Sequence, residues 1–220
     1  MKTLNNSIVV ITSFSFFVGV VVGLAYVLYI GFLHREYFAQ PVDLIAMQRE
    51  FSFSKYVLGE EGSLVSDDLV YVVAGNAYIT GTLPTDINFE HPPVVKYVYG
   101  WFTDQFKNPL LGSFMFFGVF IFATIWLGLQ HLKHWSSRAI FWFFIFANPL
   151  FYEYSIKAML DLPQIAFMLL AIVATQRIFT QNGKIWLILS SLFFGLMISA
   201  KYPFPLMISL MLGTYLHSAM

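Results

Sequence analysis

The stretch "IVVITSFSFFVGVVVGLAYVLYIGFL", residues 8–33, runs for 26 residues without a charged side chain. A helix of this length rises about 39 Å, which is enough to cross a hydrocarbon core of about 30 Å with some tilt. A cleaved signal peptide has a shorter apolar core, about 7–15 residues, followed by a small-residue cleavage site. The stretch has neither property, so we expect a retained membrane-spanning helix.

The composition of the whole chain agrees with a membrane protein. Of its 220 residues 58% are hydrophobic, 11% are charged and 25 are Phe, whereas soluble domains average about 25% charged residues. The formal charge at pH 7 is zero, which gives no indication of a nucleic acid or a strongly acidic partner. The absence of cysteine excludes disulfides and cysteine metal sites. We expect an all-α integral membrane protein.

Further apolar stretches predict a polytopic bundle. Residues 108–130 form a second charge-free span. Four shorter apolar runs follow, at residues 139–152, 162–176, 185–200 and 202–216. Each is shorter than the ~18 apolar residues of a clear span, and such lengths are typical of helices whose polar ends are buried in protein. The pattern predicts about six transmembrane helices.

The distribution of charge predicts the orientation. If the N-terminus is cytoplasmic, the cytoplasmic segments carry no acid and five basic residues: Lys2, Lys133, Arg138, Arg177 and Lys184. This bias follows the positive-inside rule. The long segment between the first two spans then faces outward, from a plasma membrane or an ER-type membrane, and it holds ten of the twelve acids.

The expected division is therefore an N-terminal transmembrane helix (1–33), an extracytoplasmic loop with the candidate active site (34–108), and transmembrane helices 2–6 (109–220). A loop this long usually has structure and function of its own. We expect short helices at residues 41–53 and 67–79, the second beginning after the N-cap residue Ser66 and ending before Gly81.

Two groups of ionisable residues in the loop are candidates for chemistry. Asp67 and Asp68 could supply a general base and a ligand for a metal or an acceptor, although the helix dipole alone favours acids in a first turn. In "EHPPVVK", the two prolines hold Glu90 and His91 in an extended conformation, and Lys96 follows one turn into the next helix. Lys96 is placed to meet an anionic headgroup or phosphate, or else is an ordinary interfacial lysine.

Two further groups lie among the later helices. Glu153, Lys157 and Asp161 are spaced i, i+4, i+8 and would share one face of a continuous helix, where they could neutralise one another. Lys201 and Tyr202 stand between two apolar runs. Lys201 could bind a lipid phosphate or could anchor the chain by snorkelling to the interface.

These groups occur in a recognisable order: "LVSDDLVYVVAGNAYITG", "NFEHPPVVKY", "YSIKAMLDLPQIAFMLLAI" and "GLMISAKYPFPLMI". The chain resembles the protein O-mannosyltransferase-like branch of the GT-C glycosyltransferases, which use sugars carried on polyprenyl or dolichyl phosphate. That family has an acidic pair, an acid-His-Pro-Pro-x-x-Lys element, an Asp-x-Pro and a Lys-Tyr in this order. Its members are generally longer, so we expect this chain to be a portion of such an enzyme or to act with a partner subunit that supplies further helices.

The resemblance implies an inverting transfer of a mannose-like sugar from the lipid carrier to a hydroxyl of a protein or glycan acceptor, outside the cytoplasm. Asp67 would be the base, with Asp68 beside it as a second catalytic acid. The implied substrate-binding residues are Glu90, His91, Lys96, Asp161, Lys201 and Tyr202. A divalent metal, held by Asp68, Glu90 and His91, is compatible with the resemblance, but Asp68 stands where the family usually has Glu, one methylene longer.

Two other classes of protein remain open from the residues alone. A transporter would have ionisable groups or broken helices near the membrane midplane, commonly between internal repeats. Here the two longest spans carry no charge and no repeat is evident. A non-catalytic membrane partner of such an enzyme would share the motifs without the activity.

Overall fold

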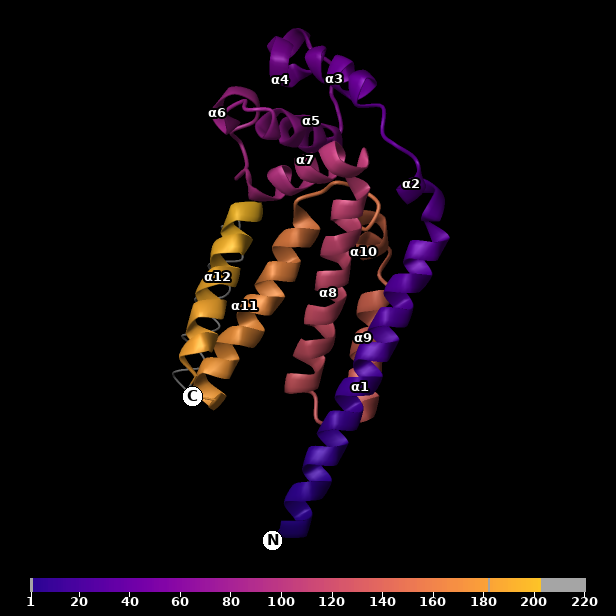
Figure 1. The fold of residues 1–220 in the computed structure, drawn as a ribbon, viewed down its shortest axis with the longest axis vertical. Helices are drawn as coiled ribbons and strands as arrows, with labels where there is room; N and C mark the ends of the chain where they lie inside the picture. The colour runs from indigo at the N-terminus through magenta and orange to yellow at the C-terminus, as the bar shows by residue number, and fades with distance from the viewer. Residues whose placement is uncertain (1, 182, 203–220) are drawn as a thin grey trace.

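The computed structural model describes residues 2–181 and 183–202, and this part of the chain is helical (Figure 1). Its elements are α1 (Lys2–Leu33), α2 (Arg35–Ala39), α3 (Leu44–Ser52), α4 (Lys55–Leu58), the 3₁₀ turn η1 (Gly59–Glu61), α5 (Asp67–Ile79), α6 (Pro84–Ile87), α7 (Val94–Phe106), α8 (Leu110–His131), α9 (Trp135–Phe146), α10 (Pro149–Tyr154), α11 (Asp161–Gln181) and α12 (Lys184–Ala200). No strand forms within these residues, and an isolated bridge joins Ser54 to Ser63.

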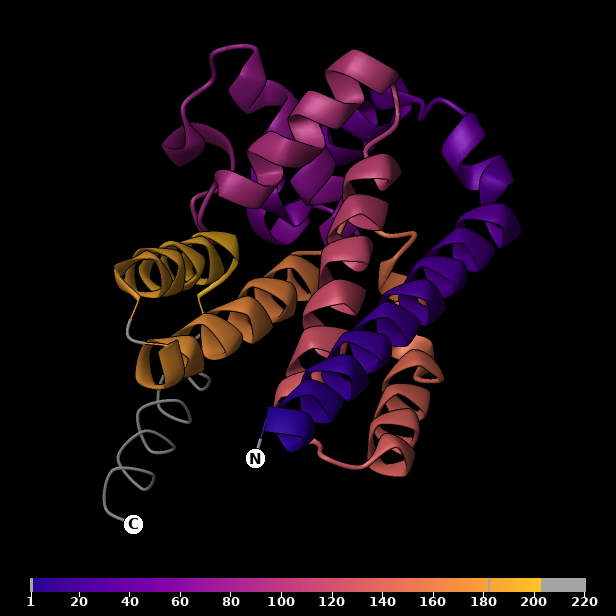
Figure 2. The ribbon, with the colours of Figure 1, turned by 60° about the horizontal axis from the view of Figure 1, so that its bottom comes forward.

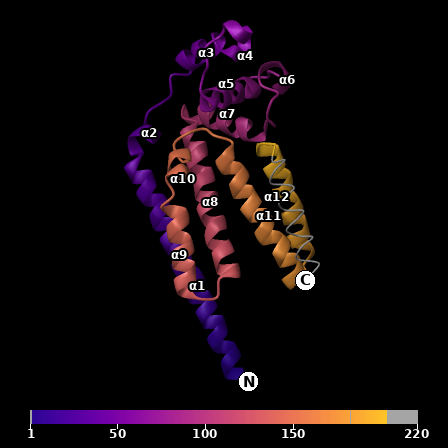
Figure 3. The same cartoon turned by 180° about the vertical axis from the view of Figure 1, so that it is seen from behind.

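Three helices of the described chain are long and apolar enough to cross a membrane, namely the Phe16–Leu33 part of α1, α8, and the Asp161–Thr180 part of α11. They confirm the spans expected from residues 8–33, 108–130 and 162–176. Figures 1 and 3 show α1, α8 and α11 running lengthwise beside one another. Their core is aromatic and aliphatic, with Phe117, Phe120 and Ile121 almost fully buried. The protein is therefore an integral membrane protein.

The later helices differ from the expectation in one place. Residues 139–152 fall in two helices, α9 and α10, so the structure does not confirm the single span expected there. Pro149 has no N–H with which to continue α9, and the side chain of Asn148 instead accepts a hydrogen bond from the N–H of Leu150 at 3.0 Å, which caps α10. α12 is apolar but has only 17 residues. The sixth expected span, residues 202–216, lies outside the described residues except for Tyr202.

The segment between α1 and α8 folds into a layer of short helices, α3–α7, which we call the polar layer. Figures 1 and 2 show α5 and α7 lying across the ends of α8, α11 and α12, with α3 and α4 on the far side of α5. α5 has the bounds that the sequence predicted, and α3 falls inside the predicted 41–53. Asp43 begins α3, because its carboxylate accepts a hydrogen bond from the N–H of Ala46 at 2.9 Å.

α5 and α7 cross in direct backbone contact at Gly75 and Gly100. A Cβ atom added to Gly75 would lie 2.1 Å from the carbonyl oxygen of Lys96, and one added to Gly100 would lie 2.1 Å from the carbonyl oxygen of Gly75. Glycine is therefore required at both positions for this close approach. The crossing fixes the start of α5 relative to the start of α7, where the candidate residues lie.

Polar contacts fasten this layer to the membrane bundle. The side-chain amide of Asn108, which is 1% exposed, donates hydrogen bonds to the carbonyl oxygens of Tyr37 (2.7 Å) and Gln40 (2.8 Å). The hydroxyl of Tyr99, on α7, donates to the carbonyl oxygen of Met159 in the connection between α10 and α11 (2.6 Å). Buried hydrogen bonds of this kind hold the layer in one position over the bundle.

Candidate active site

An acidic pocket lies at the start of α5. Asp67, the first residue of α5, and Glu90, in the connection before α7, line the same pocket of about 480 Å³. Glu90 and His91 lie in bends and not in the extended conformation that the prolines predicted. Lys55 and Tyr56, from α4, form another part of its wall. Burial raises the pKa of Tyr56, and the charges of Glu90 and Asp67 add to this shift. The structure thus brings together two of the sequence-predicted residues, Asp67 and Glu90.

Asp68 is in a different environment from its neighbour. Successive residues of an α-helix point about 100° apart, and the charge of Asp68 acts on Lys157, beyond the pocket. A hydrogen bond to Glu153 raises the pKa of Lys157, and Asp68 contributes to the same shift. Among the described residues no group of three or more side chains that could hold a metal occurs, so the structure does not gather Asp68, Glu90 and His91 into one.

Lys96 holds the loop before α7. Its side chain is fully buried, and its ammonium donates hydrogen bonds to the carbonyl oxygens of Asn88 (3.0 Å) and His91 (2.8 Å) and to the side-chain oxygen of Asn88. From the sequence, Lys96 either meets an anionic headgroup or phosphate or is an ordinary interfacial lysine. In the structure all three ammonium hydrogens have protein acceptors, so Lys96 is a positioning residue for the loop that carries Glu90 and His91.

The buried ammonium predicts a pH effect. Burial lowers the pKa of Lys96 from 10.5 to about 8, with Glu90 opposing the shift. We expect activity to fall above about pH 8 as the loop loses its charged anchor, and Lys96→Gln to have low activity without this alkaline fall. The unfolded chain keeps the Lys96 proton up to about pH 10.5. Because the folded state releases this proton at lower pH, the free energy of unfolding rises between about pH 8 and pH 10.5. The melting temperature is measured over the same pH range as the activity. A melting temperature that falls together with the activity above about pH 8 would contradict this account.

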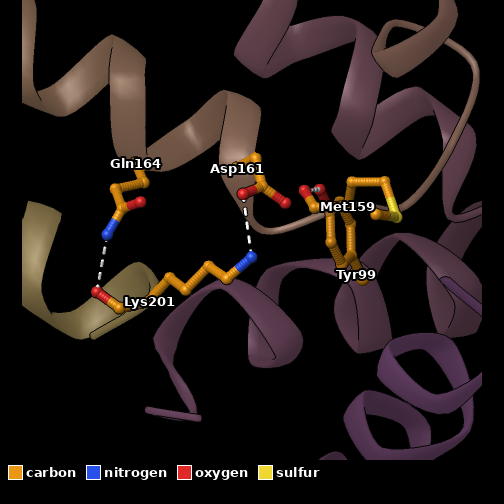
Figure 4. Close-up of polar contacts among 5 residues, drawn as sticks. All are labelled: Tyr99, Met159, Asp161, Gln164 and Lys201. Carbon is orange, nitrogen blue, oxygen red and sulfur yellow. Dashed lines mark hydrogen bonds and ion pairs between the residues drawn. The ribbon is translucent and has the colours of Figure 1, made fainter. Parts of the chain in front are cut away.

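A second charged group lies where α11 begins and α12 ends (Figure 4). The ammonium of Lys201 forms an ion pair with Asp161 at 2.8 Å, and both side chains remain about a quarter exposed, 27% and 29%. The side-chain amide of Gln164 donates to the carbonyl oxygen of Lys201 at 2.8 Å, which fixes the end of α12. Lys201 is therefore a positioned and accessible cation.

This geometry corrects the expected charge triplet. α10 ends at Tyr154 and α11 begins at Asp161, and the chain between them is not helical. The three residues with the i, i+4, i+8 spacing therefore do not share one helix face. Glu153 and Lys157 pair with each other, while Asp161 pairs with Lys201.

His91 and Tyr71 connect the two groups. Burial lowers the pKa of His91, with Lys201 and Lys96 adding to the shift and Glu90 and Asp67 opposing it. Its ring centroid lies 6.0 Å from that of Tyr71 and 6.4 Å from that of Tyr202. His91 is thus within electrostatic range of both the acidic pocket and the Lys201 ammonium, and it is kept neutral near pH 7.

Tyr71 was not recognised from the sequence. It is only 3% exposed, and its hydroxyl makes no hydrogen bond to any described residue. Burial raises its pKa, and the charges of Asp67 and Asp161 add to the shift. The available signal was its spacing, because Tyr71 is four residues after Asp67 and lies on the same face of α5. Its ring lies 6.0 Å from that of His91, and its phenol is a hydrogen-bond donor.

The fold and the site define an integral membrane protein with carboxylates and a paired lysine gathered at one end of its helical bundle. A family model described as dolichyl-phosphate-mannose-protein mannosyltransferase matches residues 90–219, more than half of the chain. The chain belongs to this family and is a glycosyltransferase of the mannosyltransferase type. Neither the comparison with curated proteins nor that with solved structures finds a match.

The matched range covers part of the site. Glu90, His91, Lys96, Asp161 and Lys201 fall inside it, whereas Asp67 and α5 precede it. Assignment of a role to Asp67 therefore depends on the pocket that it shares with Glu90.

Proposed function

We propose that the chain transfers a mannosyl residue from a dolichyl- or polyprenyl-phosphate carrier to a hydroxyl group of a protein acceptor, with inversion at the anomeric carbon. The acceptor oxygen attacks that carbon while its proton passes to the carboxylate of Asp67. The bond between the anomeric carbon and the phosphate oxygen breaks, and its electron pair stays on the phosphate. Such a reaction needs a base for the acceptor and positive charge for the leaving phosphate.

Two described residues support this proposal. Asp67 is exposed in an acidic pocket, where its carboxylate is open to an incoming hydroxyl. Lys201 is the accessible ammonium of the second group, and its ion pair with Asp161 holds it in place for a phosphate. Glu90 and His91 shape the acceptor side, and the rings of Tyr71 and Tyr202 lie 6.0 Å and 6.4 Å from the ring of His91.

One observation carries this proposal. Asp67 and Asp161 are far apart in the sequence, yet the charges of both act on the buried ring of Tyr71. The His91 ring gives the geometric support, because it lies 6.0 Å from the ring of Tyr71, one turn after Asp67, and 6.4 Å from that of Tyr202, next to Lys201. We propose on this ground that the base and the paired lysine act on one sugar.

We further propose that this site faces the extracytoplasmic side. The basic residues Lys133 and Arg138 lie where α8 passes into α9, and Arg177 and Lys184 lie where α11 passes into α12. Both connections are at the end of the bundle opposite the polar layer in Figure 1. A cytoplasmic location of these basic residues follows the positive-inside rule and puts the polar layer outside.

Replacing Lys201 tests the phosphate assignment. We expect Lys201→Ala to lower kcat/KM for the lipid-linked donor by about 10²-fold, since a preorganised charge at the leaving group is commonly worth this much, and Lys201→Arg to retain part of the activity. The measurement is donor turnover by the full chain in lipid nanodiscs. Lys184→Ala, which removes the same charge at the opposite end, is the control. Equal kcat/KM in Lys201→Ala and Lys184→Ala would remove Lys201 from the site.

A further inference from the structure

The end of the bundle opposite the polar layer carries positive charge that no acid balances (Figure 1). None of the twelve acids of the chain lies in α8, in α9 or after Asp161. The ion pairs among the described residues are those of Lys55, Lys157 and Lys201. Arg177, near the end of α11, therefore has no carboxylate partner within the described chain.

Trp186, in the first turn of α12, contacts the two other helices that end here. Its ring centroid lies 5.9 Å from that of Trp126 on α8, and the guanidinium carbon of Arg177 on α11 lies 5.8 Å from the Trp186 ring. Gln130 is four residues after Trp126 and therefore shares its face of α8. These four side chains, from three helices, thus lie on one side of the bundle, and we call them the basic-end site.

Two buried polar atoms of the basic-end site have no hydrogen-bond partner among the described residues. One is the Nε donor of Arg177, and the other is the side-chain carbonyl oxygen of Gln130, an acceptor. Arg138, at the same end, differs, because its Nε donates to the carbonyl oxygen of Leu132 at 2.7 Å. A buried polar group without a partner is costly, and more so when it is charged. The pair therefore indicates a ligand that both accepts and donates hydrogen bonds.

The position of the site in the bundle indicates a lipid. Tryptophan is enriched where a membrane meets water, so Trp126 and Trp186 place the site at the level of the headgroups. The forked donors of arginine fit a phosphate, and basic sites between membrane helices bind anionic headgroups. In the orientation proposed above, this end meets the cytoplasmic leaflet, which contains anionic phospholipids.

From these observations we infer that the basic-end site binds an anionic phospholipid whose headgroup carries a hydroxyl. The phosphate accepts hydrogen bonds from the guanidinium of Arg177, and the headgroup hydroxyl donates to the side-chain oxygen of Gln130. The bound lipid joins the ends of α8, α11 and α12 and so stabilises the bundle. This inference rests on the membrane bundle and not on the proposed reaction, so a test of lipid binding is independent of mannosyl transfer.

The test is native mass spectrometry of the full chain in detergent micelles, which counts bound lipids, with the melting temperature as a second readout. The probes are phosphatidylglycerol, phosphatidylmethanol (the same charge without a headgroup hydroxyl), zwitterionic phosphatidylcholine, and glycerol 3-phosphate as a soluble phosphate. We expect phosphatidylglycerol to bind most tightly and to raise the melting temperature. Glycerol 3-phosphate should change neither readout.

Arg177→Gln should weaken phosphatidylglycerol binding about tenfold, which is a common effect of losing a hydrogen bond to a charged group. Arg49→Gln is the control, because it removes an exposed arginine from α3 in the polar layer, and it should bind the lipid like the unaltered protein. Gln130→Leu should abolish the preference for phosphatidylglycerol over phosphatidylmethanol, and it tests the site even if Arg177→Gln does not fold.

Three results would overturn the inference. They are equal phosphatidylglycerol binding in Arg177→Gln and Arg49→Gln, equal binding of phosphatidylglycerol and phosphatidylmethanol by the unaltered protein, and stabilisation by glycerol 3-phosphate as large as that by the lipid.

Discussion

Asp67→Asn is expected to slow mannosyl transfer by about 10²–10⁴-fold, the usual contribution of a positioned general base. Asparagine keeps the size of the side chain but cannot take the acceptor's proton. Because Asp67 is exposed and forms no ion pair among the described residues, its replacement should leave folding and donor KM unchanged. Transfer is measured by counting labelled mannose on an acceptor peptide, and the residual product should still have the configuration opposite to that of the donor.

Two further carboxylates make this result specific. Asp86→Asn removes an exposed acid elsewhere in the polar layer, on α6, and should be neutral. Asp68→Asn should cost far less than Asp67→Asn, because Asp67 lines the pocket and Asp68 is not among the residues that line it. If Asp68→Asn abolished transfer and Asp67→Asn did not, the base would be wrongly assigned.

Gly75→Ala is expected to have the largest effect on stability. The added methyl group would lie 2.1 Å from the carbonyl oxygen of Lys96, and this neighbour is backbone, so α5 and α7 must separate. Overpacking of a tight core costs about 1–3 kcal/mol, and we expect at least about 3 kcal/mol here because no side chain can move aside. Since α5 carries Asp67 and α7 carries Lys96, transfer should fall as well.

The melting temperature in nanodiscs is the measurement for this variant. Gly118→Ala, on α8, is the matched control, because nothing lies within 4 Å of the position of its added Cβ. It should be neutral or slightly stabilising, as alanine favours helix. If the Gly75→Ala and Gly118→Ala proteins had the same melting temperature, this would contradict the close crossing of α5 and α7.

Much of the fold follows from local signals in the sequence. Charge-free stretches predicted α1 and α8, and α5 was predicted within its observed bounds from Ser66, the acids of its first turn and Gly81. Local patterns did not predict the helix break within residues 139–152. Hydropathy alone does not show that one helix ends and another begins at Asn148 and Pro149. Apolar content predicts burial, but helix ends depend on single hydrogen bonds.

The sequence selected residues that the structure brings together, but it did not show which contacts each of them makes. The order of motifs selected Glu90, His91, Asp161 and Lys201, which lie together or in ion pairs. The sequence could not show that Lys96 points into its own loop, since this depends on the tertiary contact with Asn88. The sequence predicted either a phosphate-binding or a snorkelling role for Lys201, and it could not show the ion pair with Asp161, 40 positions earlier.

The central claim is that the polar layer, with Asp67 and its pocket, faces the extracytoplasmic side, where a lipid-linked sugar meets its acceptor. The chain has no cysteine, so single thiols introduced as Ile45→Cys on α3 and Ser136→Cys on α9 report the two ends of the bundle. The measurement is their labelling by a membrane-impermeant maleimide in intact cells. We predict labelling of Ile45→Cys before permeabilisation and of Ser136→Cys only afterwards, and the reverse pattern would contradict the account.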